Sequence, residues 1–148
     1  MNSNRPILLV EDNLSDADLT RRALAKGHIS NDLVVVEDGQ EALDYLRGVG
    51  AYTGRAISET PSVVLLDLKL PRVSGLEVLR QIRADARLRR IPVVILTSSK
   101  EEEDIAAGYD LGVNSYVRKP VDFREFQTAI ESLGLYWLIL NEPNPPVR

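Results

Sequence analysis

Runs of branched apolar residues recur along the chain and alternate with segments of helical spacing. The runs cover residues 7–10, 33–36, 63–66 and 93–96, and a weaker one lies around Tyr116 and Val117. An unbroken apolar run is typical of a strand buried on both faces, because neither face keeps polar positions. The pattern therefore predicts five buried strands.

Helical periodicity fills the intervals between these runs. The predicted helices are residues 15–26, capped by Ser15 and stopped by Gly27; residues 40–47; residues 75–83; and a fourth between a capping box of Ser99 with Glu102 and a stop at Gly112. Strands that alternate with helices imply βαβ crossovers and a parallel sheet. The expected fold class is a doubly wound α/β domain, with helices on both faces of a five-stranded parallel sheet.

Residues 48–61 form a long connection that contains Gly48, Gly50 and Gly54. A glycine-rich nucleotide loop would follow a strand, whereas this segment follows a predicted helix. We therefore expect a flexible surface loop here.

Composition narrows the class of protein. A chain of 148 residues is sized for one domain, and its formal net charge of -4 and pI near 5.1 argue against nonspecific binding to nucleic acid or anionic lipid. The arginines of residues 80–90 are expected to form a solvated helix end.

The chain has no cysteine, and His28 is its single histidine. These two facts disfavour a thiolate or histidine metal site and a histidine-dependent catalytic triad. The sequence also shows no signal peptide and no apolar run of membrane-spanning length. We therefore expect a cytoplasmic protein.

Acidic and polar residues stand where the predicted strands end. Glu11 and Asp12 follow the first strand, Asp67 the third, Thr97 the fourth and Lys119 the fifth. Because the carboxyl ends of parallel strands meet at one edge of a sheet, these side chains are expected to lie together. Carboxylates about 4 Å apart repel by roughly 1 to 4 kcal/mol per pair, so the site needs a cation. Hard oxygen ligands in a partly hydrated site suit Mg²⁺.

Taken in order, these residues resemble the receiver domain of two-component response regulators. The resemblance rests on Glu11 with Asp12, on Asp67 and the Gly75 that follows it, on Thr97 with Ser98, and on Lys119 with Pro120. It extends from about residue 5 to residue 135, and every key position of the family is filled. The resemblance implies a flavodoxin-like receiver fold with strand order 2-1-3-4-5.

Carried over by position, the resemblance makes Asp67 the acceptor of a phosphoryl group from a phosphohistidine on a sensor histidine kinase. Asp12 and Asp67 would bind Mg²⁺ through their side chains, and Lys69 through its backbone carbonyl. Glu11 would act largely through water. Lys119 and Thr97 would contact the phosphoryl oxygens.

The resemblance also implies a switch. Movement of Thr97 would let Tyr116 turn inward, and this change would reach a surface of the fourth helix, the fifth strand and the fifth helix. The peptide between Lys119 and Pro120 is a candidate cis bond.

The last predicted helix carries more apolar residues than one buried face requires. The buried stripe is Phe123, Phe126, Ile130, Leu133, Trp137 and Leu140. Off this stripe lie Leu135, Tyr136, Leu138 and Ile139. An exposed apolar patch of this kind favours a homodimer through the last helix and its neighbours, although Tyr136 and Trp137 as core aromatics are the alternative.

The expected organisation is a receiver domain over residues 5–140 with an extended last helix, a Pro-rich tail over residues 141–148, and no effector domain. The apolar residues 135–138, the following residues 141–143 and the long middle loop resemble the stand-alone regulators that pair with phytochrome-type histidine kinases.

Two other functions stay open. One is a Mg²⁺-dependent phosphohydrolase with Asp67 as nucleophile, but Lys69 stands where a second carboxylate would act as general acid. The other is a scaffold that dimerises without phosphorylation, which the intact set of Asp12, Asp67, Thr97 and Lys119 disfavours.

Overall fold

The computed structural model describes residues 5–26, 31–56, 60–97 and 102–118, together with positions 124, 128 and 132. Five parallel strands form one sheet in the order β2-β1-β3-β4-β5. The strands are β1 (Ile7–Val10), β2 (Leu33–Val36), β3 (Val63–Leu66), β4 (Val93–Thr97) and β5 (Ser115–Arg118). The predicted fold class and strand order are therefore confirmed.

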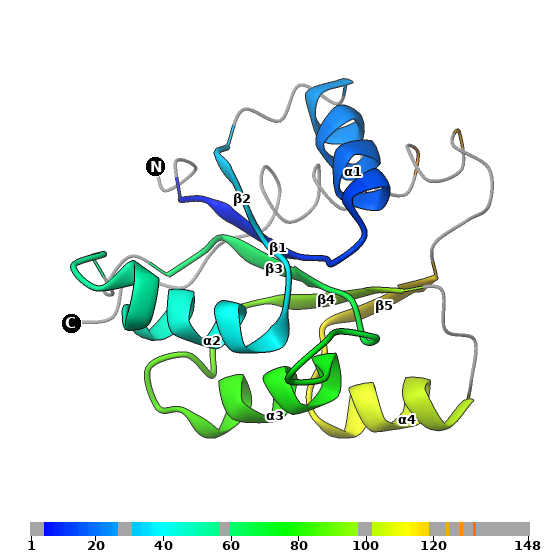
Figure 1. Ribbon diagram of the computed structural model, residues 1–148. Coiled ribbons are helices and arrows are strands. Elements are labelled where there is room, and N and C mark those ends of the chain that lie inside the picture. Colours follow the sequence, from blue (N-terminus) through cyan, green and yellow to red (C-terminus); the bar gives the residue numbers. More distant parts are fainter. Residues whose placement is uncertain are drawn as a thin grey trace.

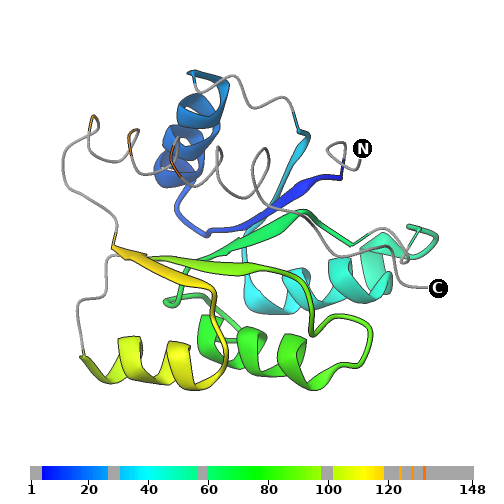
Figure 2. The ribbon, with the colours of Figure 1, turned by 180° about the vertical axis from the view of Figure 1, so that it is seen from behind.

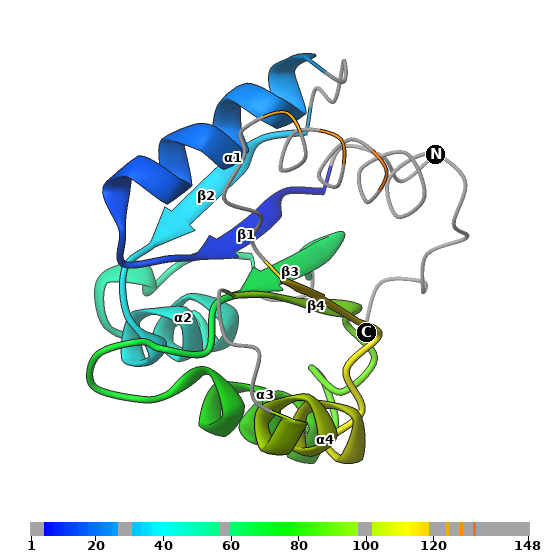
Figure 3. The same ribbon diagram turned by 90° about the vertical axis from the view of Figure 1, so that its right-hand side faces the viewer.

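Helices cover both faces of the sheet. Helix α1 (Leu14–Lys26) lies on one face, and α2 (Gly39–Arg47), α3 (Gly75–Ala84) and α4 (Glu102–Asp110) lie on the other (Figures 1, 2 and 3). Within the described part of the chain, no helix is long and apolar enough to cross a membrane. Apart from positions 124, 128 and 132, the predicted last helix and its tail lie outside the described residues.

Successive residues of each strand enter two different cores, which explains the unbroken apolar runs. In β1, Ile7 and Leu9 pack on the α1 side with Ala23 and Leu24, whereas Leu8 and Val10 pack on the side of α2 and α3. All four β1 residues are buried. Burying a side chain of this size contributes about 1.5–3 kcal/mol.

The helix boundaries confirm some expected caps and correct one. Asn13, not Ser15, caps α1, because its Oδ1 accepts a hydrogen bond from the Asp16 amide at 2.9 Å. Gly112 follows α4 with a φ of 86°, the left-handed conformation in which glycine is favoured, as the predicted stop requires. Ser99 lies outside the described residues.

The connection after α2 contains regular structure that the sequence did not predict. It contains a short 3₁₀ helix, η1 (Gly50–Tyr52), and Arg55 beyond it donates to the carbonyl oxygens of Tyr45 at 2.8 Å and Leu46 at 3.2 Å. The Arg55 guanidinium also lies 4.3 Å from the centre of the Tyr45 ring. Most of residues 48–56 are exposed, as expected for a surface loop, and Arg55 satisfies the carbonyls at the end of α2.

The arginines of α3 and of the turn after it are only partly a solvated helix end. Arg80, Arg89 and Arg90 are exposed, as predicted. Arg83 instead donates to the carbonyl oxygens of Gly112 at 2.9 Å and Ile91 at 2.8 Å, and burial lowers its pKa. This side chain therefore ties α3 to the turn between α4 and β5.

Tyr52 gives the connection after α2 a pH-dependent contact. Its hydroxyl donates to Glu41 Oε2 at 2.6 Å, and burial together with this hydrogen bond raises the pKa of Tyr52 to about 12. Because the folded-state pKa lies above the ordinary value of 10.0, this contact contributes fully to stability below pH 10 and is lost as the pH rises toward 12.

We expect Tyr52→Phe to lower the free energy of unfolding at pH 8 and the difference from the natural protein to shrink between pH 10 and 12. Urea unfolding of both proteins across this range measures the difference. A difference that stays constant up to pH 12 would contradict the assignment.

Candidate functional site

The pairing of β1 with β3 brings two acidic residues to one edge of the sheet. Val10 lies opposite Leu66 in the parallel register, so the residues that follow them, Glu11 and Asp67, leave the sheet at the same level. The Asp67 amide donates to the Val10 carbonyl at 3.1 Å, and the Glu11 amide donates to the Val36 carbonyl at 2.9 Å. Backbone hydrogen bonds therefore fix where both side chains begin.

Three carboxylates meet at this edge. One oxygen from each of Glu11, Asp12 and Asp67 lies within 4.8 Å of the others, and we call these residues the acidic cluster. Glu11 is 1% exposed and Asp67 7% exposed, whereas Asp12 is exposed to solvent. The structure thus brings these acids together as the sequence predicted, with two carboxylates below the surface and one on it.

Neighbouring backbone amides orient the two buried carboxylates. Asn13 donates its amide to Glu11 Oε2 at 3.2 Å, and Lys69 donates its amide to Asp67 Oδ1 at 3.3 Å. Each donor follows its acceptor by two residues, so the turn after each strand supplies the hydrogen bond. These bonds therefore fix the orientation of both carboxylates where the strands end.

The structure describes only some of the other predicted site residues. Thr97 is the fully buried last residue of β4, which neighbours β3. Tyr116 on β5 is half-buried, with its ring 3.6 Å from the position that a Cβ on Gly108 of α4 would take. The other predicted site and interface residues lie outside the described residues. They are Lys119, Pro120, Leu135, Tyr136, Leu138 and Ile139.

Lys69 makes a contact that the sequence did not suggest. Its side chain is 65% exposed and points to α4, where its Nζ lies 3.8 Å from Asp104 Oδ2. The residue predicted to offer its backbone carbonyl to a metal therefore also links the segment after β3 to α4 by charge.

The segment after β3 makes a second contact that the sequence did not predict, between Arg72 and Asp38. Asp38 caps α2 by accepting from the Glu41 amide at 2.7 Å, and its Oδ2 lies 3.4 Å from Arg72 Nη1. Asp38 and Glu41 have the spacing of a capping box, and this spacing could have predicted the start of α2 from the sequence. Arg72 has a φ of 66°, a left-handed conformation that costs a residue with a side chain about 1–2 kcal/mol.

Gly75 lies against the backbone of the candidate nucleophile. A Cβ at this position would lie 2.1 Å from the Asp67 carbonyl oxygen and 2.7 Å from Leu68 Cα, distances that no side chain tolerates. The Gly75 amide in turn donates to the Leu68 carbonyl at 3.0 Å. The first residue of α3 is therefore packed directly on the strand end that carries Asp67.

Comparison with known proteins identifies the family of this chain. The model of the response regulator receiver domain matches residues 7–131. The chain belongs to the response regulator receiver family. The buried acid after β3, the two acids after β1 and the sheet order are thus features of a receiver domain.

Three relatives show which receivers this chain is similar to. It is 44% identical over 140 residues to a probable methanogenesis regulatory protein FilR2 of Methanothrix harundinacea, covering 95% of this chain and 88% of that protein. It is 38% identical over 138 residues to the response regulator Rcp1 of Synechocystis, covering 92% of each. The structure of the phosphorylated cyanobacterial phytochrome response regulator RcpA matches with a TM-score of 0.89 at 39% identity, covering 96% of this chain and 99% of that one. The chain is thus a receiver protein related to phytochrome response regulators.

We expect Gly75→Ala to destabilise this receiver by about 1–3 kcal/mol, because the added methyl must displace the Asp67 backbone. Urea unfolding measures the change. Gly108→Ala is the matched control, since its Cβ meets first the end of the flexible Ile95 side chain at 2.9 Å. Equal stability of the two variants would contradict the packing argument.

Proposed function

We propose that Asp67 accepts a phosphoryl group from the phosphohistidine of a sensor histidine kinase, with a divalent cation held by the acidic cluster. The observation that carries this proposal is the meeting of the Asp67, Glu11 and Asp12 carboxylates within 4.8 Å at the edge of a parallel sheet. The function of the receiver family agrees with it.

The transfer is a substitution at phosphorus. A carboxylate oxygen of Asp67 forms a bond to phosphorus while the bond from phosphorus to the kinase imidazole nitrogen breaks, and the histidine leaves as neutral imidazole because its other ring nitrogen carries a proton. The product is an acyl phosphate on Asp67. Such a transfer asks the protein chiefly to position the groups and to balance their charge. The amide of Lys69 on Asp67 Oδ1 serves the first need.

The donor set of the acidic cluster fits Mg²⁺. All three residues offer hard carboxylate oxygens within 4.8 Å of one another, and Mg²⁺ is usually held in proteins by one or two carboxylates together with water. Asp12 and Asp67 would hold the ion directly, Lys69 through its backbone carbonyl, and Glu11 through water. A bound cation supplies positive charge against the charge that develops on the phosphoryl group. A structure of the relative Rcp1 is a Mn²⁺-bound form, which supports a divalent cation here.

Residues on β4 and β5 would complete the site and transmit its state. Thr97 would donate its hydroxyl to a phosphoryl oxygen and Lys119 would pair with another. Tyr116, which is half-buried, would turn further inward when Thr97 shifts. The altered surface would then be that of α4, β5 and the last helix.

The kinase partner is proposed to be of the phytochrome type. The similarity to RcpA and Rcp1 over nearly the whole of both relatives supports this. The similarity to FilR2 shows that related chains serve other pathways. A phosphotransfer assay that compares a purified phytochrome-type kinase with an unrelated kinase distinguishes a phytochrome-type partner from a partner of another kind.

The phosphorylation proposal predicts a covalent adduct. With acetyl phosphate and Mg²⁺, intact mass measurement is expected to show one phosphoryl group per chain, absent in Asp67→Asn. Glu11→Gln is expected to raise the Mg²⁺ concentration needed by roughly 10- to 100-fold, because it removes charge beside the ion. Asp18→Asn, an acid of an exposed ion pair on α1, is the control and should behave like the natural protein.

No adduct on the natural protein would contradict phosphorylation and favour a scaffold that acts without it. Rapid turnover of a phosphomonoester, abolished by Asp67→Asn, would instead favour a phosphohydrolase.

The proposal includes a homodimer through α4, β5 and the last helix. It rests on the apolar residues Leu135, Tyr136, Leu138 and Ile139, which lie off the predicted buried stripe of that helix.

Light scattering of the natural protein at tens of micromolar is expected to give a dimer, and Leu138→Asp is expected to give a monomer. Leu14→Asp is the control, because Leu14 on α1 is 68% exposed and lies outside the proposed interface. A monomer with and without phosphorylation would exclude the dimer.

A further inference from the structure

The segment after β3 contacts the start of α2 through Pro71, Arg72 and Val73. The Gly39 amide donates to the Pro71 carbonyl at 3.4 Å, and the same carbonyl accepts from the Val73 amide at 2.8 Å. A Cβ on Gly39 would lie 2.0 Å from the Val73 carbonyl oxygen, so the two backbones touch. We call residues 67–74 the β3–α3 loop; its middle has no room to move toward α2.

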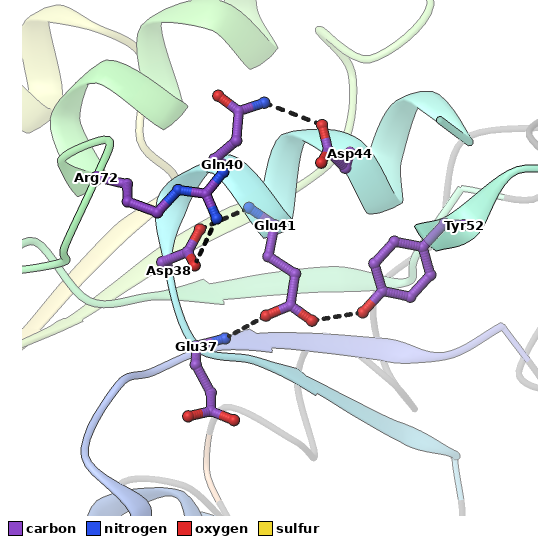
Figure 4. A network of polar contacts seen from close by, with 7 residues as sticks. All are labelled: Glu37, Asp38, Gln40, Glu41, Asp44, Tyr52 and Arg72. Carbon is purple, nitrogen blue, oxygen red and sulfur yellow. Dashed lines mark hydrogen bonds and ion pairs between the residues drawn. The ribbon is translucent and has the colours of Figure 1, made fainter. Parts of the chain in front are cut away.

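One charged pair closes this contact. Asp38 uses Oδ1 to cap α2 and Oδ2 to bind Arg72, which lies in the left-handed conformation at the middle of the β3–α3 loop (Figure 4). A left-handed backbone at a residue with a side chain persists only when surrounding contacts hold it. The Asp38 carboxylate and the shared Pro71 carbonyl are contacts of this kind.

Asp38 is itself held in place. The Glu41 side chain accepts from the Glu37 amide through Oε1 at 3.0 Å and from the Tyr52 hydroxyl through Oε2 at 2.6 Å (Figure 4). Glu37 is the neighbour of Asp38, so the backbone that presents the Asp38 carboxylate is fixed from both sides. Arg72 therefore binds to a rigid acceptor.

The pair joins the segment after β2 to the β3–α3 loop, and each of these segments contacts a buried carboxylate residue. On one side, Asp38 stands two residues after Val36, whose carbonyl accepts from the Glu11 amide at 2.9 Å. On the other side, Arg72 belongs to the loop whose Lys69 amide donates to Asp67 Oδ1 at 3.3 Å. A contact outside the acidic cluster thus connects the backbone segments next to Glu11 and Asp67.

We propose that Asp38 and Arg72 are positioning residues for phosphorylation at Asp67. The pair sets the conformation of the β3–α3 loop and through it the position of the Asp67 carboxylate relative to Glu11 and Asp12. This inference rests on the proposed function of Asp67. Because exposed ion pairs add little to stability, the pair is expected to act on the rate of phosphorylation and not on folding.

The test measures the rate constant of phosphorylation by acetyl phosphate across Mg²⁺ concentrations, by intact mass, together with urea unfolding of each protein. Asp38→Asn keeps a good helix cap while it removes the charge that binds Arg72. Arg72→Gln removes the other charge. Each variant is expected to lower the rate constant at saturating Mg²⁺ about tenfold, since a small misplacement of reacting groups costs this much or more.

Further variants separate positioning from general effects. The double variant is expected to be no slower than either single variant, because both remove the same contact. Arg72→Lys, which keeps the charge, is expected to recover part of the rate. The matched control is Arg80→Gln, which breaks an exposed ion pair with Glu77 on α3 and is expected to leave the rate unchanged.

Three outcomes would overturn the inference. The first is an adduct on the natural protein that forms equally fast in Asp38→Asn and Arg72→Gln, which would leave the proposed function intact. The second is a rate that falls only in proportion to the folded fraction, which would assign the pair a structural role. The third is the absence of any adduct on the natural protein, which would overturn the proposed function as well.

Discussion

Parallel pairing of β1 with β3 is the constraint on which the site depends. With Val10 opposite Leu66, the two strands end at the same level, and the next residues, Glu11 and Asp67, are held by backbone hydrogen bonds. A shift of one residue in this register would turn Asp67 to the other face of the sheet. The carboxylates therefore meet because the backbone places them together, against their mutual repulsion.

The mutual repulsion of these carboxylates gives the site its preference for a bound cation. Glu11 and Asp67 are buried, and charges interact more strongly where water is excluded, so the acidic cluster favours any cation that reaches it. The surrounding loops have little freedom to relax the crowding. Gly75 packs on the Asp67 backbone, and Gly39 packs on the Val73 backbone. The two glycines let helix α3 and helix α2 approach the loop that follows Asp67, so rigidity and negative charge occur at the same place.

The sequence predicted the strands and the acidic cluster because both follow from local pattern. Burial on two faces requires unbroken apolar runs, and Glu11 and Asp67 directly follow such runs. Asn13 and Ser15 are both suitable caps, and only the path of the chain after β1 decides between them. The contacts of Arg55 and Arg83 could not be predicted from the sequence. Each side chain binds backbone carbonyls, and because every residue has a carbonyl, the residue type of the partner gives no signal. Asp38 and Arg72 are 34 positions apart, so their pairing depended on the fold.

The central claim is that the acidic cluster directs a phosphoryl group to Asp67 and to no other acid. Borohydride reduction of the phosphorylated protein, followed by peptide mapping, tests it most directly, because reduction of an aspartyl phosphate leaves homoserine at the modified position. We predict homoserine at position 67 alone, formed only when a divalent cation was present during phosphorylation. Homoserine at position 12, or at an acid outside the cluster, would contradict the account.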